Sequence, residues 1–175
     1  HTASEHNDLF DICIVGAGMA GATIASYLAF RGIKIALVDR EYVEKRRIVG
    51  ELLQPGAVQT LKKMGLERVL EGFDAQPIYG YALFNEDNEF SIEYNQDKST
   101  DYRGVGLHNG RFLQKIREDA LQNPSITQIH GTVSELIEDE NHVVTGVKYK
   151  EKHTRYLKTI NAKLTITSDG FFSSF

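Results

Sequence analysis

The residues whose types and spacing could do chemistry begin near the N-terminus, with Gly16-Ala17-Gly18-Met19-Ala20-Gly21. This string fits G-x-G-x-x-G, where the first glycine allows a tight turn, the second lets backbone amides approach a pyrophosphate, and the third lets helix and strand pack closely. Asp39 stands about 20 residues further on, where a carboxylate can accept hydrogen bonds from the two ribose hydroxyls of a dinucleotide. The chemistry that these residues indicate is dinucleotide binding.

That chemistry needs a strand, a turn and a helix to position it. Residues 10–15 are a short, apolar run that stops at Gly16, which is typical of a strand buried on both faces of a parallel sheet. Small and apolar residues then recur at helical spacing over 19–31, and 33–38 reads as a second buried strand. The pattern predicts a βαβ unit with a right-handed crossover, whose helix N-terminus offers N–H donors to phosphates.

The identity of the dinucleotide depends on Asp39 and on the C-terminal half of the chain. An acid at position 39 disfavours a 2′-phosphate, so the ligand should be FAD or NAD and not NADP. After a helix predicted over 110–122 with Asn109 as its N-cap, three antiparallel strands are expected, at 132–137, 143–150 and 154–160. This run favours a flavoprotein, because an NAD dehydrogenase continues with helices and strands in regular alternation.

Other elements are expected around this framework. A last strand at 162–167 leads into Ser168-Asp169-Gly170, a second place where a turn and a carboxylate could meet a cofactor. Between the two halves, the sequence predicts a helix over 55–64, a helical turn over 66–70, paired strands at 79–84 and 89–94, and a polar loop over 96–103.

Length, charge and cysteine content exclude several classes of function. The chain has 175 residues with 41% hydrophobic residues, which suits one globular domain. A net charge of −4 gives no footprint for nucleic acid. Cys13 is the only cysteine, and His108 and His130 lack partners at metal-ligand spacing, so no metal site is expected. Residues 1–9 are expected to be a ragged or disordered start and not a signal peptide.

Three segments carry a resemblance to a known family. They are Arg47-Ile48-Val49-Gly50-Glu51-Leu52-Leu53-Gln54-Pro55-Gly56, Leu107-His108-Asn109-Gly110-Arg111-Phe112, and residues 165–175. With them the sequence from Asp11 onward resembles the squalene monooxygenases (squalene epoxidases). The resemblance implies an α/β fold, a Rossmann-like FAD-binding domain of the flavin hydroxylase type with a parallel sheet, helices and a three-stranded antiparallel β-meander. Residues 10–175 would form this domain in truncated form, without the family's substrate domain and C-terminal membrane region.

The resemblance also implies roles for individual residues. Gln54 and Tyr81 match catalytic positions at the substrate end of the site, where their side chains can hydrogen-bond one another. Together with the glycine string and Asp39, the positions expected to contact FAD are Val15, Gly16, Gly18, Met19, Ala20, Gly21, Asp39, Arg40, Arg47, Glu51, Leu52, Arg111, Val133, Asp169 and Gly170.

The activity implied by the resemblance is the epoxidation of squalene to (S)-2,3-oxidosqualene with O₂ in sterol biosynthesis. FAD would be the cofactor, and electrons would come from NADPH through a partner, NADPH-cytochrome P-450 reductase. The location implied is the cytosolic face of the endoplasmic reticulum membrane, held through regions not included here, and these 175 residues are expected to be inactive alone. Two alternatives stay open, a fragment of a flavin-dependent aromatic hydroxylase and a non-catalytic dinucleotide-binding remnant.

Overall fold

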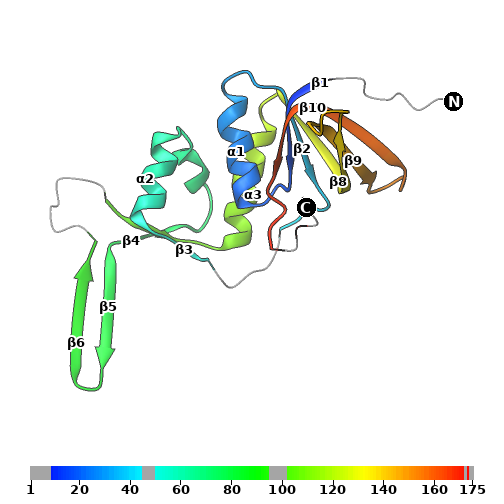
Figure 1. Cartoon of the computed structure of the whole chain (residues 1–175). Coiled ribbons are helices and arrows are strands. Elements are labelled where there is room, and N and C mark those ends of the chain that lie inside the picture. Colours follow the sequence, from blue (N-terminus) through cyan, green and yellow to red (C-terminus); the bar gives the residue numbers. More distant parts are fainter. Residues whose placement is uncertain (1–8, 45–49, 95–101, 172, 174–175) are drawn as a thin grey trace. The chain divides into compact units, whose positions relative to one another are not determined.

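The computed structural model describes residues 9–44, 50–94, 102–171 and 173 (Figure 1). The chain divides into two compact units. One unit, called here the outer unit, consists of His1–Val43 and Leu113–Phe175, and the other, the inserted unit, is Glu44–Phe112. Of the start expected to be ragged over residues 1–9, residues 1–8 lie outside the described residues, and the expectation is wrong for Leu9, which is the first residue of a strand.

The outer unit contains a parallel sheet and an antiparallel meander. β1 lies parallel to β2 on one side and to β10 on the other, and β2 lies parallel to β8. β9 runs antiparallel to both β8 and β10. The elements are β1 (Leu9–Val15), α1 (Met19–Ala29), β2 (Ile35–Asp39), α3 (Asn109–Leu121, whose start belongs to the inserted unit), β8 (Ile126–Glu138), β9 (Val144–Glu151) and β10 (Leu157–Thr167).

Two long strands belong to both sheets. In β8, His130 pairs with Asp39 of β2, and the next residue, Gly131, pairs with Glu151 of β9. In β10, Asn161 pairs both with β1 and with β9. The strand pairing therefore closes on itself in the order β1-β10-β9-β8-β2.

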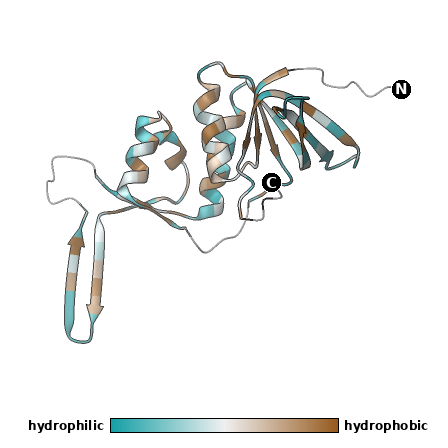
Figure 2. Cartoon of the chain, viewed as in Figure 1, coloured by the Kyte–Doolittle hydropathy of each residue, from teal (hydrophilic) through white to brown (hydrophobic). Residues whose placement is uncertain are grey.

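The core of the outer unit lies on both faces of the parallel strands. Ile35 and Leu37 of β2 pack in a cluster with residues of α1 and α3, whereas Ala36 and Val38 pack with residues of the meander. This alternation makes the parallel sheet a middle layer with helices on one face and the meander on the other. Figure 2 shows hydrophobic residues along the parallel strands. The prediction of a Rossmann-like sheet with a three-stranded meander is confirmed.

The inserted unit contains a small sheet, a hairpin and short helices. β7 lies between β3 and β4 and is antiparallel to both, and β5 and β6 form a separate antiparallel pair in which Tyr81 faces Ile92. Its elements are β3 (Leu52–Leu53), α2 (Pro55–Lys63), a 3₁₀ helix (Glu67–Leu70), β4 (Gln76–Ile78), β5 (Gly80–Asn85), β6 (Asn88–Glu93) and β7 (Gly104–Gly106).

Some sequence expectations need correction. The strands expected at 154–160 and 162–167 are one strand, β10, because Asn161 between them keeps its pairing. Asn109 is the first residue of α3 and not its N-cap, and its side chain instead donates a hydrogen bond of 3.4 Å to the carbonyl oxygen of Gly50. Within the described part of the chain, no helix has the length and apolar character needed to cross a membrane.

Candidate cofactor site

The glycine loop between β1 and α1 has three glycines with different surroundings. Gly16 has a φ of +99°, and a Cβ atom there would lie 2.5 Å from the carbonyl oxygen of Ser168. A Cβ atom on Gly21 would collide with the carbonyl oxygen of Gly16. At Gly18 a Cβ atom would meet nothing within 4 Å. The protein's own packing therefore requires glycine at 16 and 21, whereas position 18 opens onto free space that a ligand can enter.

The N-terminus of α1 begins directly at this open position. Gly18 is the N-cap in an extended conformation, and no side chain caps the helix or places an acid in its first turn. The first N–H groups of a helix have no partner within the helix, and they attract anions together with the helix dipole. The loop is therefore suited to a phosphate ligand.

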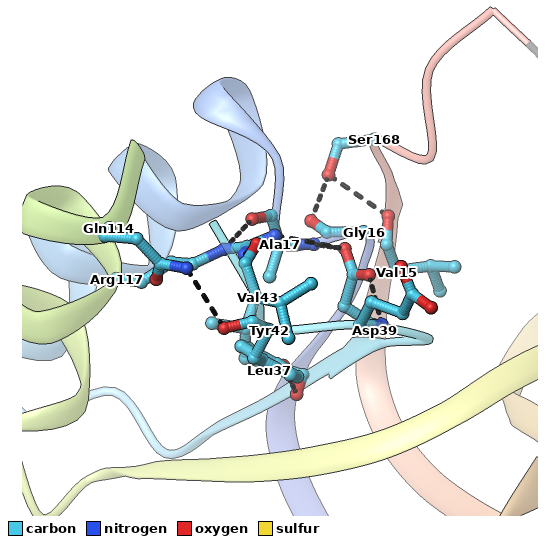
Figure 3. A network of polar contacts seen from close by, with 11 residues as sticks. Val15, Gly16, Ala17, Leu37, Asp39, Tyr42, Val43, Gln114, Arg117 and Ser168 are labelled. Carbon is cyan, nitrogen blue, oxygen red and sulfur yellow. Dashed lines mark hydrogen bonds and ion pairs between the residues drawn. The ribbon is translucent and has the colours of Figure 1, made fainter. Parts of the chain in front are cut away.

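Asp39 ends β2 beside the same loop (Figure 3). Its Oδ2 atom accepts a hydrogen bond of 2.7 Å from the backbone N–H of Ala17, and its Oδ1 accepts one of 2.9 Å from Glu41. The side chain is 12% exposed. Because a carboxylate has about four acceptor positions, the oriented Asp39 can still accept bonds from ribose hydroxyls.

The turn after β10 closes the loop from the other side. The backbone N–H of Ser168 donates to the carbonyl oxygen of Val15 at 2.7 Å, and its hydroxyl donates to that of Gly16 at 2.9 Å. These bonds hold the turn against the glycine loop and so place Asp169 and Gly170 beside it. Both residues are exposed, and Gly170 has a φ of +86°. Ser168 has a structural part in the site that sequence reasoning did not assign to it.

The remaining predicted residues of the outer unit differ in their surroundings. Val15 is buried at the end of β1, and Met19 and Ala20 form the start of α1. Arg40 is exposed directly after Asp39, and Val133 of β8 packs against the core beneath the meander. Hydrogen bonds thus join the glycine loop to Asp39 and to the Ser168 turn. Within the described part of the chain, no hydrogen bond links Arg40 or Val133 to the loop.

In the inserted unit, Arg111 at the start of α3 is held by a carboxylate. Its Nη1 atom lies 2.6 Å from Oδ2 of Asp74, and Nδ1 of His108 lies 2.7 Å from the same oxygen. The hydrogen bond from Arg111 is the main reason why the pKa of Asp74 is lowered, and the same bond raises the pKa of Arg111. Sequence reasoning did not select Asp74, because a single acid in a loop carries no pattern.

The other predicted residues of the inserted unit lie around β3. The carbonyl oxygen of Glu51 accepts a hydrogen bond of 2.8 Å from Leu107, and Leu52 pairs with Gly106 of β7. Arg47 lies outside the described residues. Within the described ranges, no group of three histidine, cysteine or acidic side chains is arranged to hold a metal ion.

Gln54 and Tyr81 meet within the inserted unit. Nε2 of Gln54 donates a hydrogen bond to the hydroxyl oxygen of Tyr81. The ring of Tyr94 packs edge-on against that of Tyr81, with centroids 5.3 Å apart and an angle of 83° between the planes. The expected hydrogen bond is present, and the role of the pair toward a substrate remains a prediction.

Comparison with known proteins places this loop in a family. Residues 10–175 match the family described as the FAD binding domain, and the chain belongs to this family. The class that the fold and the glycine loop define is therefore that of FAD-binding proteins. In sequence, the chain is 44% identical to "Squalene epoxidase 3" of Arabidopsis thaliana and 37% identical to "Squalene monooxygenase" of Mus musculus. These similarities confirm the family resemblance of the sequence.

The two relatives are much longer than the chain. Each alignment covers 94% of this chain, but only 31% of the Arabidopsis protein and 29% of the mouse protein. Among solved structures, the myxobacterial chondrochloren halogenase CndH superposes with a TM-score of 0.79 at 20% identity, covering 95% of this chain and 38% of that one. This match supports the fold alone.

Proposed function

We propose that the protein carrying this chain is an FAD-dependent squalene monooxygenase, which converts squalene to (S)-2,3-oxidosqualene with O₂. The observation that carries the proposal is the 37–44% identity to proteins with that name over 94% of the chain. Within that protein, the residues of this chain bind FAD. An aromatic hydroxylase or a non-catalytic remnant is less well supported, because the sequence similarity is to squalene epoxidases over nearly its whole length.

In this proposal the outer unit binds the ADP half of FAD. Backbone amides at Gly18 and at the first turn of α1 hold the pyrophosphate, and Asp39 accepts the ribose hydroxyls. The open space at Gly18, the uncapped helix and the oriented carboxylate support this assignment. The other contacts proposed are Val15, Gly16, Met19, Ala20, Gly21, Arg40, Arg47, Glu51, Leu52, Arg111, Val133, Asp169 and Gly170.

Bound FAD, once reduced, supplies the activation of O₂, so no nucleophilic side chain is needed. The task left to the protein is to place an alkene and to exclude water. Squalene has no polar group for Gln54 or Tyr81 to bind, so their mutual hydrogen bond would fix the shape of the pocket wall. We assign them this positioning role.

The electron source and the location belong to the same proposal. We infer from the resemblance to squalene monooxygenases that NADPH supplies the electrons through NADPH-cytochrome P-450 reductase, and we assign the glycine loop to FAD. An apolar substrate dissolves in lipid, which supports a place at a membrane. We propose the cytosolic face of the endoplasmic reticulum from the resemblance to squalene monooxygenases.

The proposal is tested with the full-length protein that carries these residues. After purification, its released flavin is identified, and its turnover is measured with squalene, NADPH and the reductase, with a small phenolic substrate offered in parallel. We expect FAD and a squalene epoxide. Release of NAD alone, or hydroxylation of the phenol with no reaction of squalene, would contradict the proposal.

A further inference from the structure

Arg117 of α3 is a buried charged residue to which the proposed function assigns no role. Its side chain is 2% exposed, and it shares one face of the helix with Leu113, Ile116 and Ala120, which are all buried. Burial lowers the pKa of Arg117, and the nearby Asp39 opposes this effect. A guanidinium in an apolar stripe is costly unless its N–H groups are satisfied, so its partners indicate what it does.

The partners of Arg117 lie in the loop after β1, at the end of β2 and in the loop after β2 (Figure 3). Nε donates a hydrogen bond of 2.7 Å to the carbonyl oxygen of Ala17, and Nη1 donates one of 3.3 Å to that of Val43. Nη2 lies 3.9 Å from Oδ2 of Asp39. The ring of Tyr42 lies 5.2 Å from the guanidinium carbon.

Ala17 is thereby held at both of its backbone polar atoms. Its N–H donates to Oδ2 of Asp39 and its carbonyl oxygen accepts from Arg117. In a trans, planar peptide unit the C=O and the following N–H point in opposite directions. When Arg117 draws the Ala17 carbonyl into the core, the N–H of Gly18 must therefore point away from it. Position 18 is the open one, where a Cβ atom would meet nothing within 4 Å.

We propose that Arg117 is a positioning residue for the dinucleotide: it fixes the Ala17–Gly18 peptide so that Gly18 presents its N–H to the pyrophosphate. Through its charge it also keeps the Asp39 carboxylate directed at the ribose. This inference rests on the proposed roles of the glycine loop and Asp39. Arg117 itself touches no ligand, because its donors are directed at protein atoms.

A packing role for Arg117 would give a different result from a positioning role, and the helix offers a matched control. Ser26 of α1 donates a hydrogen bond to Asp119 of α3, and both side chains are buried. This pair joins the same two helices through side chains that belong neither to the glycine loop nor to Asp39. Ser26→Ala removes a buried polar contact of α3 but leaves the loop intact.

The test compares Arg117→Met, Arg117→Lys and Ser26→Ala in the full-length protein. Dissociation constants of the apoprotein are measured by calorimetry for FAD and for ADP, which carries the pyrophosphate, ribose and adenine without the flavin half. The denaturant midpoint of each apoprotein is measured as well. We expect Arg117→Met to raise the dissociation constants for FAD and for ADP by the same factor, roughly tenfold or more. Ser26→Ala should lower the denaturant midpoint of the apoprotein, but it should change neither dissociation constant by more than about twofold.

Two outcomes would overturn the inference. One is unchanged ADP binding in Arg117→Met, whether or not FAD binding falls, and the other is an equal loss of affinity in Arg117→Met and Ser26→Ala. If Arg117→Met does not fold, Arg117→Lys decides, since lysine keeps the charge but lacks the fork that reaches both Ala17 and Asp39. Wild-type affinity in that variant refutes positioning. Failure of the wild-type protein to bind ADP would instead contradict the proposed site itself.

Discussion

The backbone N–H of Ala17 donates a 2.7 Å hydrogen bond to the Asp39 carboxylate, which joins the loop after β1 to the end of β2. The acid expected to hold a ribose is therefore part of the loop expected to hold the pyrophosphate. A carboxylate that is oriented before binding loses less freedom when a ligand arrives. The pyrophosphate and the ribose of an ADP group would therefore bind to one site that is assembled before the ligand arrives.

Replacing Asp39 with alanine should weaken FAD binding by roughly 1–3 kcal/mol, because the ribose loses a charged acceptor. The variant also loses the bonds from Ala17 and Glu41, so its apoprotein should unfold at lower denaturant. Calorimetric titration of FAD measures the effect. Asp39→Asn retains one acceptor oxygen, so its affinity for FAD should lie between those of the wild type and Asp39→Ala. Wild-type affinity for FAD in the alanine variant would contradict the role of Asp39 at the ribose.

Alanine at Gly21 should mainly lower the stability of the apoprotein, whereas alanine at Gly18 should mainly weaken FAD binding. Gly21→Ala should destabilise the apoprotein by roughly 2–3 kcal/mol, because its Cβ collides with the Gly16 carbonyl. Gly18→Ala should cost less than about 1 kcal/mol of stability but weaken FAD binding, since the methyl group occupies the open approach to the pyrophosphate. Urea unfolding and FAD titration separate the two. Equal affinity for FAD in Gly18→Ala and in the wild type would show that the pyrophosphate does not bind at Gly18.

The Asp74–Arg111 pair should make a pH-dependent contribution to stability. The pKa of Asp74 is lowered in the folded protein, mainly by the hydrogen bond from Arg111. The contribution is therefore complete above the pKa of Asp in the unfolded chain, about 3.9, and is lost as the pH falls through the lower folded value. Asp74→Asn should be less stable than wild type near neutral pH, with the difference shrinking below about pH 4. Denaturation at a series of pH values measures it; a constant difference would show that the pair is not the cause.

Cys13 should resist thiol reagents until the protein unfolds. The side chain is fully buried in β1, and desolvation raises its pKa to about 12. Since the thiolate is the reactive form, the native thiol stays protonated and inaccessible at neutral pH. Alkylation followed by peptide mass spectrometry should find Cys13 unmodified in native protein and modified in denaturant. Rapid native labelling would mean that β1 opens.

Tyr81→Phe should lower squalene turnover several-fold while FAD content stays near wild type. The variant keeps the ring beside Tyr94 but deprives Gln54 of its hydroxyl partner. Flavin absorbance and turnover are measured in the full-length protein, with Tyr79→Phe as the control because Tyr79 is 62% exposed in the same segment. A parallel loss of flavin would place Tyr81 in the support of the cofactor.

The sequence predicted the βαβ unit to within two residues at each boundary, since an apolar run ending in glycine followed by a helical repeat is a local signal. It did not predict β3, β4 and β7, because strands of two or three residues carry no period. The first half of β8 was also missed. Its residues are partly exposed, and only pairing with β2 across the sheet defines them as a strand.

The candidate site divides in the same way. Glycines and an acid at fixed spacing indicated the loop and Asp39 from the chain alone. Arg117 and Asp74 act through contacts made by residues distant in sequence, and Arg117 looked like any charged residue of a helix. Its position in the apolar repeat of Leu113, Ile116 and Ala120 was the one local sign that it is buried.

The pairing of β1 with β10 has a consequence for synthesis on the ribosome. Val15 cannot bond to Ser168 until the ribosome has added the 153 residues that separate them. At about 5–20 residues per second, this delay is roughly eight to thirty seconds. During that time β1 has an open, apolar edge of the kind that recruits other chains. The inserted unit, whose residues are contiguous, can fold first. The glycine loop would be completed last, when the nascent chain delivers the hydroxyl of Ser168 to Gly16.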